Sequence, residues 1–174
     1  MYWAETLERG GFHREIAGYA DFTAAVKACK LAFGVTRKGI IVAGEYGVGK
    51  SCLVKAIAAS YQIRPRTINL ADSRDLEKLS EEWMSYFAEN LYEQTLILDD
   101  LGAEKPTSVY GVRIESAGEF IANYHARGTG RLFITTNLTA AEIDARYGGR
   151  VLSRLKDLCA PLRLNGKDKR KWEL

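Results

Sequence analysis

One segment of the sequence fits the phosphate-binding loop pattern GxxxxGK[ST] at every fixed position: Gly44-Glu45-Tyr46-Gly47-Val48-Gly49-Lys50-Ser51. An apolar run at 39–43 precedes it and an apolar-periodic stretch follows it, so the segment has the strand and the helix that the pattern requires. Its glycines let consecutive backbone N–H groups approach phosphate oxygens that a Cβ would obstruct. The positive end of the following helix faces the same anion. The segment therefore predicts a nucleotide phosphate site.

Two side chains of this loop have expected roles of their own. Lys50 should reach the β- and γ-phosphates, and the Ser51 hydroxyl should ligate Mg²⁺. The nucleotide is expected to contact the whole run and the residue after it, namely Gly44, Glu45, Tyr46, Gly47, Val48, Gly49, Lys50, Ser51 and Cys52. We therefore predict ATP or ADP with Mg²⁺ as the ligands.

A second motif lies 48 residues after Ser51, where the apolar strand candidate 94–98 ends in Asp99 and Asp100. A continuous apolar strand is typical of a parallel sheet buried on both faces. At the carboxyl edge of such a sheet, Asp99 is placed to hold Mg²⁺ or its water shell, and Asp100 to orient or deprotonate the attacking water. This is a Walker B pattern. Many ATPases have glutamate at the second position, so the shorter Asp100 predicts slow hydrolysis.

Another buried strand is predicted at 131–137, and it ends in Asn137. An amide at that position can bind the attacking water or the γ-phosphate, which makes Asn137 a candidate sensor of the nucleotide. A lone asparagine is more often a turn residue. Its place on the strand after the two carboxylates favours the functional interpretation.

Length and composition are those of one globular domain. A chain of 174 residues is long enough for a substantial core, and we expect one domain over 1–174, with an N-terminal arm at 1–20 and a basic tail at 165–174. No apolar run approaches the roughly 18 residues of a membrane span, and the N-terminus lacks a signal-peptide core. Three scattered cysteines suggest reduced thiols. We therefore expect a cytoplasmic protein that does not enter a membrane.

Charge is distributed unevenly along the chain. Residues 68–120 contain twelve acidic and four basic side chains, whereas residues 145–174 contain nine basic and three acidic ones. Two explanations stay open: neighbouring copies dock acidic against basic surfaces, or the tail contacts nucleic acid or an acidic partner. The first explanation predicts a homo-oligomer with head-to-tail contacts.

The second half of the chain is expected to alternate loops and helices. Residues 102–110 contain a proline and small polar side chains, so a loop is predicted there. The apolar stripe of the next helix is expected to start at Ile114. Further along, Pro161 is expected to end a helix and to leave 162–164 as a last edge strand.

A helix pair is predicted between these features. Thr139 and Glu142 form a capping box that opens its first helix. Arg150 and Arg154 lie on one face of its second helix, four residues apart. One interpretation is a solvated basic face. The other is an arginine finger that reaches the nucleotide of a neighbouring subunit, with Arg154 as the first candidate and Arg150 as the second.

Several motifs together resemble the bacterial helicase-loader branch of the AAA+ ATPases, the DnaC/DnaI and IstB-like proteins. They are the phosphate-binding loop, Leu-Asp-Asp-Leu-Gly at 98–102, Thr-Thr-Asn-Leu at 135–138 and Tyr-Gly-Gly-Arg-Val-Leu-Ser-Arg-Leu at 147–155, followed by Leu-Asn-Gly-Lys-Asp-Lys-Arg. The resemblance covers roughly residues 16–170. It implies a three-layer P-loop NTPase fold of the ASCE type, with helices on both faces of a five-stranded parallel sheet of order 5-1-4-3-2.

The resemblance also implies how the site works. ATP would be bound between subunits, with Asn137 as the first sensor and Arg154 as a finger acting in trans, so that an isolated monomer hydrolyses ATP slowly. The catalytic set is then Lys50, Asp99, Asp100, Asn137 and Arg154. Only fifteen residues follow Cys159, so we expect no C-terminal helical lid.

Three functions are compatible with these observations. The resemblance implies an ATPase of DNA replication that acts on a replicative helicase and on single-stranded DNA. One alternative is a transposition helper, with a transposase as partner. The other is a nucleotide-dependent assembly or regulatory module with little turnover.

Overall fold

The computed structural model describes residues 39–60, 64–72, 94–105, 107–109, 112–114, 116–166 and 168. The expected N-terminal arm lies outside these residues, and so does most of the expected basic tail. In the part of the chain that is described, no helix is long and apolar enough to cross a membrane.

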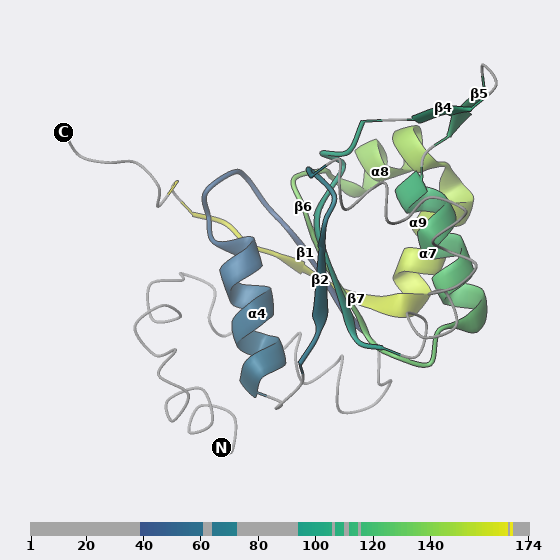
Figure 1. Cartoon of the computed structure of the whole chain (residues 1–174). Coiled ribbons are helices and arrows are strands. Elements are labelled where there is room, and N and C mark those ends of the chain that lie inside the picture. The colour runs from purple at the N-terminus through teal and green to yellow at the C-terminus, as the bar shows by residue number, and fades with distance from the viewer. Residues whose placement is uncertain are drawn as a thin grey trace.

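Five parallel strands form the central sheet (Figure 1). They are β1 (Gly39–Ala43), β2 (Arg66–Asn69), β3 (Leu96–Leu101), β6 (Leu132–Thr136) and β7 (Cys159–Arg163). Their spatial order is β2-β3-β6-β1-β7. Numbered one to five along the chain, this is the predicted order 5-1-4-3-2 read from the other edge. The predicted fold class is confirmed.

Helices cover both faces of the sheet, which explains why its inner strands are apolar. In Figure 1, α4 (Lys50–Ser60) lies on one face, and α7 (Ser116–Arg127), α8 (Ala140–Tyr147) and α9 (Gly149–Leu158) lie on the other. All five residues of β6 are buried, whereas β2 at the edge buries one residue of four. Parallel strands enclosed on both faces have this near-continuous apolar character. The three layers are therefore helix, sheet and helix.

The core between the sheet and the helices α7, α8 and α9 is built from large apolar side chains. Phe120 and Tyr124 of α7 and Leu155 of α9 pack in one cluster with Leu98 of β3 and Ile134 of β6. Burying one such side chain stabilises the fold by roughly 1.5–3 kcal/mol. This packing holds β3 and β6 in register, and the two strands carry the polar residues of the candidate site at their carboxyl ends.

The predicted loop at 102–110 and the predicted helix start at Ile114 are partly wrong. Two short antiparallel strands, β4 (Thr107–Val109) and β5 (Val112–Ile114), lie between β3 and α7, with Thr107 paired to Ile114. Both strands contain β-branched residues, which favour extended pairing over helix. The helix α7 begins only at Ser116.

The expected boundary at Pro161 is also wrong. The helix α9 ends at Leu158, and β7 starts at Cys159, so Pro161 lies inside the strand. β7 is an edge strand that pairs with β1, with Ile41 opposite Pro161. Proline is tolerated in an edge strand because the missing N–H faces the open side.

Candidate functional site

The phosphate-binding loop connects β1 to α4 at the carboxyl edge of the sheet. Residues 44–49 form the loop, and Lys50, Ser51 and Cys52 open the helix. Gly47 has a φ of 74°, which side chains other than glycine adopt only with strain. A Cβ built on Gly47 would also lie 1.6 Å from Oδ1 of Asp168. Glycine is therefore favoured here by the backbone angle, and a larger residue would also require the Asp168 carboxylate to move aside.

Lys50 is buried at this edge, with 6% of its surface exposed. Its Nζ donates a hydrogen bond to the Glu45 carbonyl oxygen, 2.7 Å away, and another to Oδ1 of Asn137. It also lies 5.9 Å from the ring centroid of Tyr46, a side chain that is 71% exposed. The structure thus brings together the loop lysine and the candidate sensor at the end of β6, although they are 87 residues apart.

Ser51 and Asp99 are in direct contact. The Ser51 hydroxyl donates to Oδ1 of Asp99 at 2.7 Å, across 48 residues of sequence. Asp99 is 8% exposed and accepts a second hydrogen bond, from the Thr135 hydroxyl at 2.6 Å. Hydroxyl and carboxylate oxygens at this spacing are ligands that Mg²⁺ takes in nucleotide sites, where it keeps several waters and phosphate oxygens besides. The two residues predicted as metal ligands therefore fit a magnesium ion.

The two carboxylates occupy a bulge in β3. Leu98 pairs with Ile134 and Leu101 pairs with Thr136, so two residues of β3 face the single Thr135 of β6. A bulge of this kind bends its strand and redirects side chains, and it is often found beside active sites. The Thr135 hydroxyl fills the bulge, because it accepts from the Asp100 N–H at 2.9 Å while it donates to Asp99.

Asp100 is held in an unusual backbone conformation. Its φ is 63°, the one positive φ at a described residue other than glycine. Such a conformation costs of order 1–3 kcal/mol and persists where the surroundings determine it. Here Thr135 binds its N–H, and its carbonyl oxygen accepts from the Ala103 N–H at 2.9 Å.

Arg150 and Arg154 lie apart from these residues. They belong to α9, which Figure 1 shows on the face of the sheet opposite α4. Arg150 is exposed and Arg154 is half-buried, and neither forms a hydrogen bond or ion pair to the phosphate-binding loop among the residues that the structure describes. The predicted catalytic set is therefore brought together in part: Lys50 contacts Asn137, Asp99 contacts the neighbouring Ser51, and Asp100 follows Asp99 in the same bulge, whereas Arg154 does not join them within one chain.

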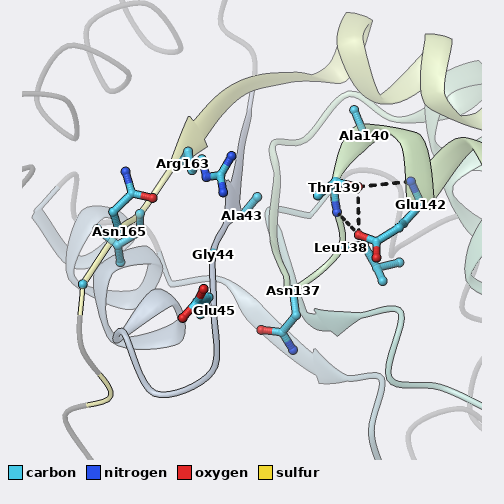
Figure 2. Close-up of a pocket in the computed structure, with 12 residues that line it drawn as sticks. Ala43, Gly44, Glu45, Asn137, Leu138, Thr139, Ala140, Glu142, Arg163 and Asn165 are labelled. Carbon is cyan, nitrogen blue, oxygen red and sulfur yellow. Dashed lines mark hydrogen bonds between the residues drawn. The ribbon is translucent and has the colours of Figure 1, made fainter.

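A cavity of about 540 Å³ opens beside the loop (Figure 2). It lies where β1, β6 and β7 end, and Gly44, Glu45, Asn137, Arg163 and Asn165 are among its lining residues. Ligands of open α/β sheets bind at the carboxyl ends of the strands. The volume is within the range of small-molecule sites. Lys50, Ser51 and Asp99 are not part of the lining, so the cavity adjoins the phosphate site without containing it.

Sequence reasoning missed Thr135. The strand at 131–137 was expected to contribute Asn137 through its polar end, but the hydroxyl of Thr135 is the group that contacts both carboxylate residues. Two adjacent threonines in a fully buried strand, directly before the candidate sensor, were the signal that could have found it. A buried hydroxyl needs a partner, and the neighbouring strand supplies one.

No protein-family model matches the sequence, and no curated protein matches it. Its fold is similar to solved structures. The crystal structure of the DnaC helicase loader has a TM-score of 0.59 and 18% identity, and the match covers 84% of this chain and 91% of that one. A protein of Streptococcus pyogenes serotype M3, named as a primosome component, has a TM-score of 0.58 and 23% identity, and the match covers 86% of this chain and 80% of that one.

A third structure is that of NtrX from Brucella abortus in complex with ATP. It has a TM-score of 0.57 and 15% identity, and the match covers 90% of this chain but only 42% of NtrX. At these identities the likeness establishes the fold. The chain has the three-layer fold of a P-loop NTPase, similar to that of the DnaC helicase loader.

Proposed function

We propose that this protein binds ATP with Mg²⁺ at the loop 44–51 and hydrolyses it, as an AAA+ ATPase of the helicase-loader type. One observation carries the proposal. The hydrogen bond between Ser51 and Asp99 and the bond between Lys50 and Asn137 join the loop, β3 and β6 at one edge of the sheet. A glycine loop alone would indicate only an anion site, but a loop joined to a carboxylate and an amide has the groups that phosphoryl transfer requires.

Each residue has a role that follows from its place. Lys50 and the loop N–H groups bind the phosphates, because a buried ammonium and converging amides suit a polyanion. Asp99 and Ser51 hold the metal, which neutralises phosphate charge when bound. Asp100 orients the attacking water or accepts its proton, and Asn137, which contacts Lys50, senses the terminal phosphate.

The site is completed by a second copy of the chain. Arg154 belongs to α9, which lies on the face of the sheet opposite α4, so its proposed action is on the nucleotide of a neighbour. The acidic stretch 68–120 and the basic stretch 145–174 support head-to-tail contacts, since opposite charges then meet at each interface. Because a trans arginine finger contributes about 10³ to 10⁵ in rate, turnover should depend on assembly.

The binding step is tested by calorimetric titration of ATP into purified protein. Lys50→Ala should abolish measurable binding, whereas Lys55→Ala should bind like the unsubstituted protein, because Lys55 is an exposed lysine on the same helix. Equal affinity of the two variants would refute the proposed phosphate site.

The trans role of Arg154 is tested by mixing. Lys50→Ala and Arg154→Ala proteins should each be inactive, and a mixture should recover ATPase activity, because one copy supplies the intact phosphate site and the other supplies the arginine. Arg150→Ala is the matched control, one turn earlier on α9, and it should retain activity without mixing. If the mixture recovers no ATPase activity under conditions in which the proteins assemble, Arg154 does not act in trans.

The partner is proposed from the fold, since the DnaC structure is that of a helicase loader. We expect ATP-dependent binding to a replicative helicase, with single-stranded DNA stimulating turnover. A pull-down with ATP, using a replicative helicase and a transposase as separate baits, distinguishes this function from that of a transposition helper. ATP-driven assembly with neither bait bound and no DNA effect would favour the regulatory module instead.

A further inference from the structure

A second polar cluster lies on the other side of the turn that carries Asp100. Its centre is Glu104, which is 4% exposed and is not part of the proposed catalytic set. Oε2 of Glu104 accepts the Gly102 N–H at 2.8 Å, and Oε1 accepts the Tyr147 hydroxyl. A buried carboxylate is costly unless it is hydrogen-bonded and paired. Glu104 meets both conditions with residues of its own turn and of α8.

Arg146 supplies the paired charge and binds the same turn. Its Nη2 lies 3.4 Å from Oε1 of Glu104, and its guanidinium donates to the carbonyl oxygens of Gly102 and Glu104. The planar fork of an arginine suits such multiple contacts. The last turn of α8 is therefore attached to residues 102–104 by side-chain and backbone bonds that span more than 40 residues of sequence.

The attached turn is the one that determines the conformation of Asp100. The Ala103 N–H binds the Asp100 carbonyl oxygen, and Ala103 lies between the two residues, Gly102 and Glu104, that the cluster holds. On the opposite side, Thr135 holds the Asp100 N–H. Asp100 is thus fixed between β6 and α8, which is the kind of support that keeps a backbone at a positive φ.

We propose that Glu104, Arg146 and Tyr147 are positioning residues that hold Asp100 in its catalytic geometry. The inference rests on the proposed function, because it assigns to the cluster an effect on water activation by Asp100. A fully satisfied buried network selects a single arrangement of the groups attached to it. A shift of about 1 Å in a catalytic group can lower the rate roughly 100-fold. Loss of the cluster should therefore lower turnover while ATP affinity is kept.

The first test is a comparison of two tyrosines, Tyr147, which is half-buried, and Tyr124, which is buried. Tyr147→Phe removes the hydroxyl bound to Glu104. Tyr124→Phe removes a hydroxyl that donates to the Gln94 carbonyl oxygen at 3.0 Å, and Gln94 precedes the amino end of β3, whereas Asp100 lies at the carboxyl end. Both variants should lose some thermal stability. Only Tyr147→Phe should lower the single-turnover rate of ATP hydrolysis, by about 10- to 100-fold, with the ATP Kd changed less than twofold. Equal rates in the two variants would overturn the inference.

The second test is a double-mutant cycle with Asp100→Asn, since asparagine tolerates the same backbone conformation. If the cluster acts through Asp100, adding Tyr147→Phe to Asp100→Asn should lower the rate no further. A full additional loss would show that the cluster acts by another route. Glu104→Gln should reproduce Tyr147→Phe in both backgrounds, and its melting temperature shows whether it remains folded.

These outcomes separate the inference from the function it rests on. If the unsubstituted protein binds no ATP or shows no hydrolysis in the assembled state, the proposed function and this inference both fail. If Asp100→Asn lowers turnover to a residual, measurable rate but Tyr147→Phe does not change the rate, only the positioning role fails.

Discussion

The sheet edge that carries the loop 44–51 and the helix pair beside it bury different kinds of side chain. We define the phosphate edge as residues 44–51 together with Asp99, Thr135 and Asn137. It buries a lysine and an aspartate, with Lys50 6% and Asp99 8% exposed. The helical corner, defined as α8 and α9, buries apolar side chains, Ile143 of α8 and Val151 and Leu155 of α9, and exposes most of its charged residues.

This difference indicates which region contributes to ligand binding and which to the stability of the fold. Charged groups are expensive to bury, so a fold that keeps them at low exposure holds them for a ligand or for a strong pair. Apolar burial contributes directly to the stability of the fold. Substitutions at the phosphate edge should therefore change ligand binding more than the free energy of unfolding, and substitutions in the helical corner should do the reverse.

Two neighbouring threonines of β6 give the largest expected contrast. Thr135 and Thr136 are both fully buried, and each hydroxyl donates one hydrogen bond and accepts another. Thr135 contacts Asp99 and the Asp100 N–H, whereas Thr136 contacts the Leu101 carbonyl oxygen and the Leu138 N–H. Thr135→Val should lower Mg²⁺ affinity in the presence of ATP by roughly 10- to 100-fold, the usual effect of losing a group that orients a metal ligand.

Thr136→Val is the control for this prediction. It removes the same hydroxyl from the next position, so both variants should lose of order 1–3 kcal/mol of stability through unsatisfied buried groups. Mg²⁺ titration of ATP binding, followed by fluorescence of a labelled nucleotide, measures the difference. If Thr136→Val lowered the Mg²⁺ affinity as much as Thr135→Val, the contact of Thr135 with Asp99 would not be the cause of the lowered affinity.

The sequence was sufficient to place the phosphate edge except for Thr135, because the other parts of the edge are short motifs on consecutive elements. The glycine loop, Asp99 and Asn137 each follow an apolar strand, and parallel strands bring their carboxyl ends to one edge. The bulge at Asp99 and Asp100 was not predictable from spacing. An apolar run followed by two acids has the same sequence pattern whether or not the strand contains an extra, bulged residue. Thr135 was missed for that reason.

Other features of the sequence were predictable only where the interaction is local. The capping box of Thr139 and Glu142 was predicted and is confirmed, because its two residues are three apart. The contacts of Glu104 with Arg146 and Tyr147 span 42 residues or more, and no periodic pattern relates such residues. The last edge strand was predicted, but its start before Pro161 and the β4–β5 pair were not, because pairing partners outweighed the local helix and turn signals.

Two glycines with positive φ allow a smaller contrast, one in each region. Gly47 at the phosphate edge has φ 74°, and Gly148 between α8 and α9 has φ 85° and ψ 156°. Alanine is strained at both, by roughly 1–3 kcal/mol. A Cβ at Gly47 would meet Asp168, whereas a Cβ at Gly148 would meet nothing within 4 Å. Gly47→Ala should weaken ATP binding about tenfold, the equivalent of 1.4 kcal/mol, and Gly148→Ala should lower only the melting temperature.

The contribution of Asp168 is separable from that of the backbone. Gly47→Ala combined with Asp168→Ala relieves the overlap and leaves the strained φ, so the double variant should regain part of the melting temperature that Gly47→Ala loses. Parallel loss of ATP affinity in Gly47→Ala and Gly148→Ala would mean that the two regions are not distinct. Differential scanning fluorimetry with and without ATP measures both effects in one experiment.

The smallest effect is expected at the start of the helical corner, where stability alone should change. The Thr139 hydroxyl accepts the Glu142 N–H at 3.3 Å, and the Thr139 N–H donates to Oε2 of Glu142 at 2.7 Å. Loss of an N-cap hydroxyl costs about 1 kcal/mol, so Thr139→Ala should lower the free energy of unfolding by that amount. Thr129→Ala, at an exposed loop threonine, should change it by less than about 0.5 kcal/mol. ATP affinity should be the same in both variants.

The capping box also predicts the sign of a pH effect. Hydrogen bonds from the backbone and then the side chain of Thr139 lower the pKa of Glu142 in the folded protein. A carboxyl with a lowered folded pKa contributes stability above its unfolded pKa and loses that contribution as pH falls through the folded value. The difference in unfolding free energy between the unsubstituted protein and Thr139→Ala should therefore narrow on acidification, as urea titrations at a series of pH values would measure. A difference that stays constant down to the lowest pH at which the protein folds would mean that the Thr139 hydroxyl does not lower the pKa of Glu142.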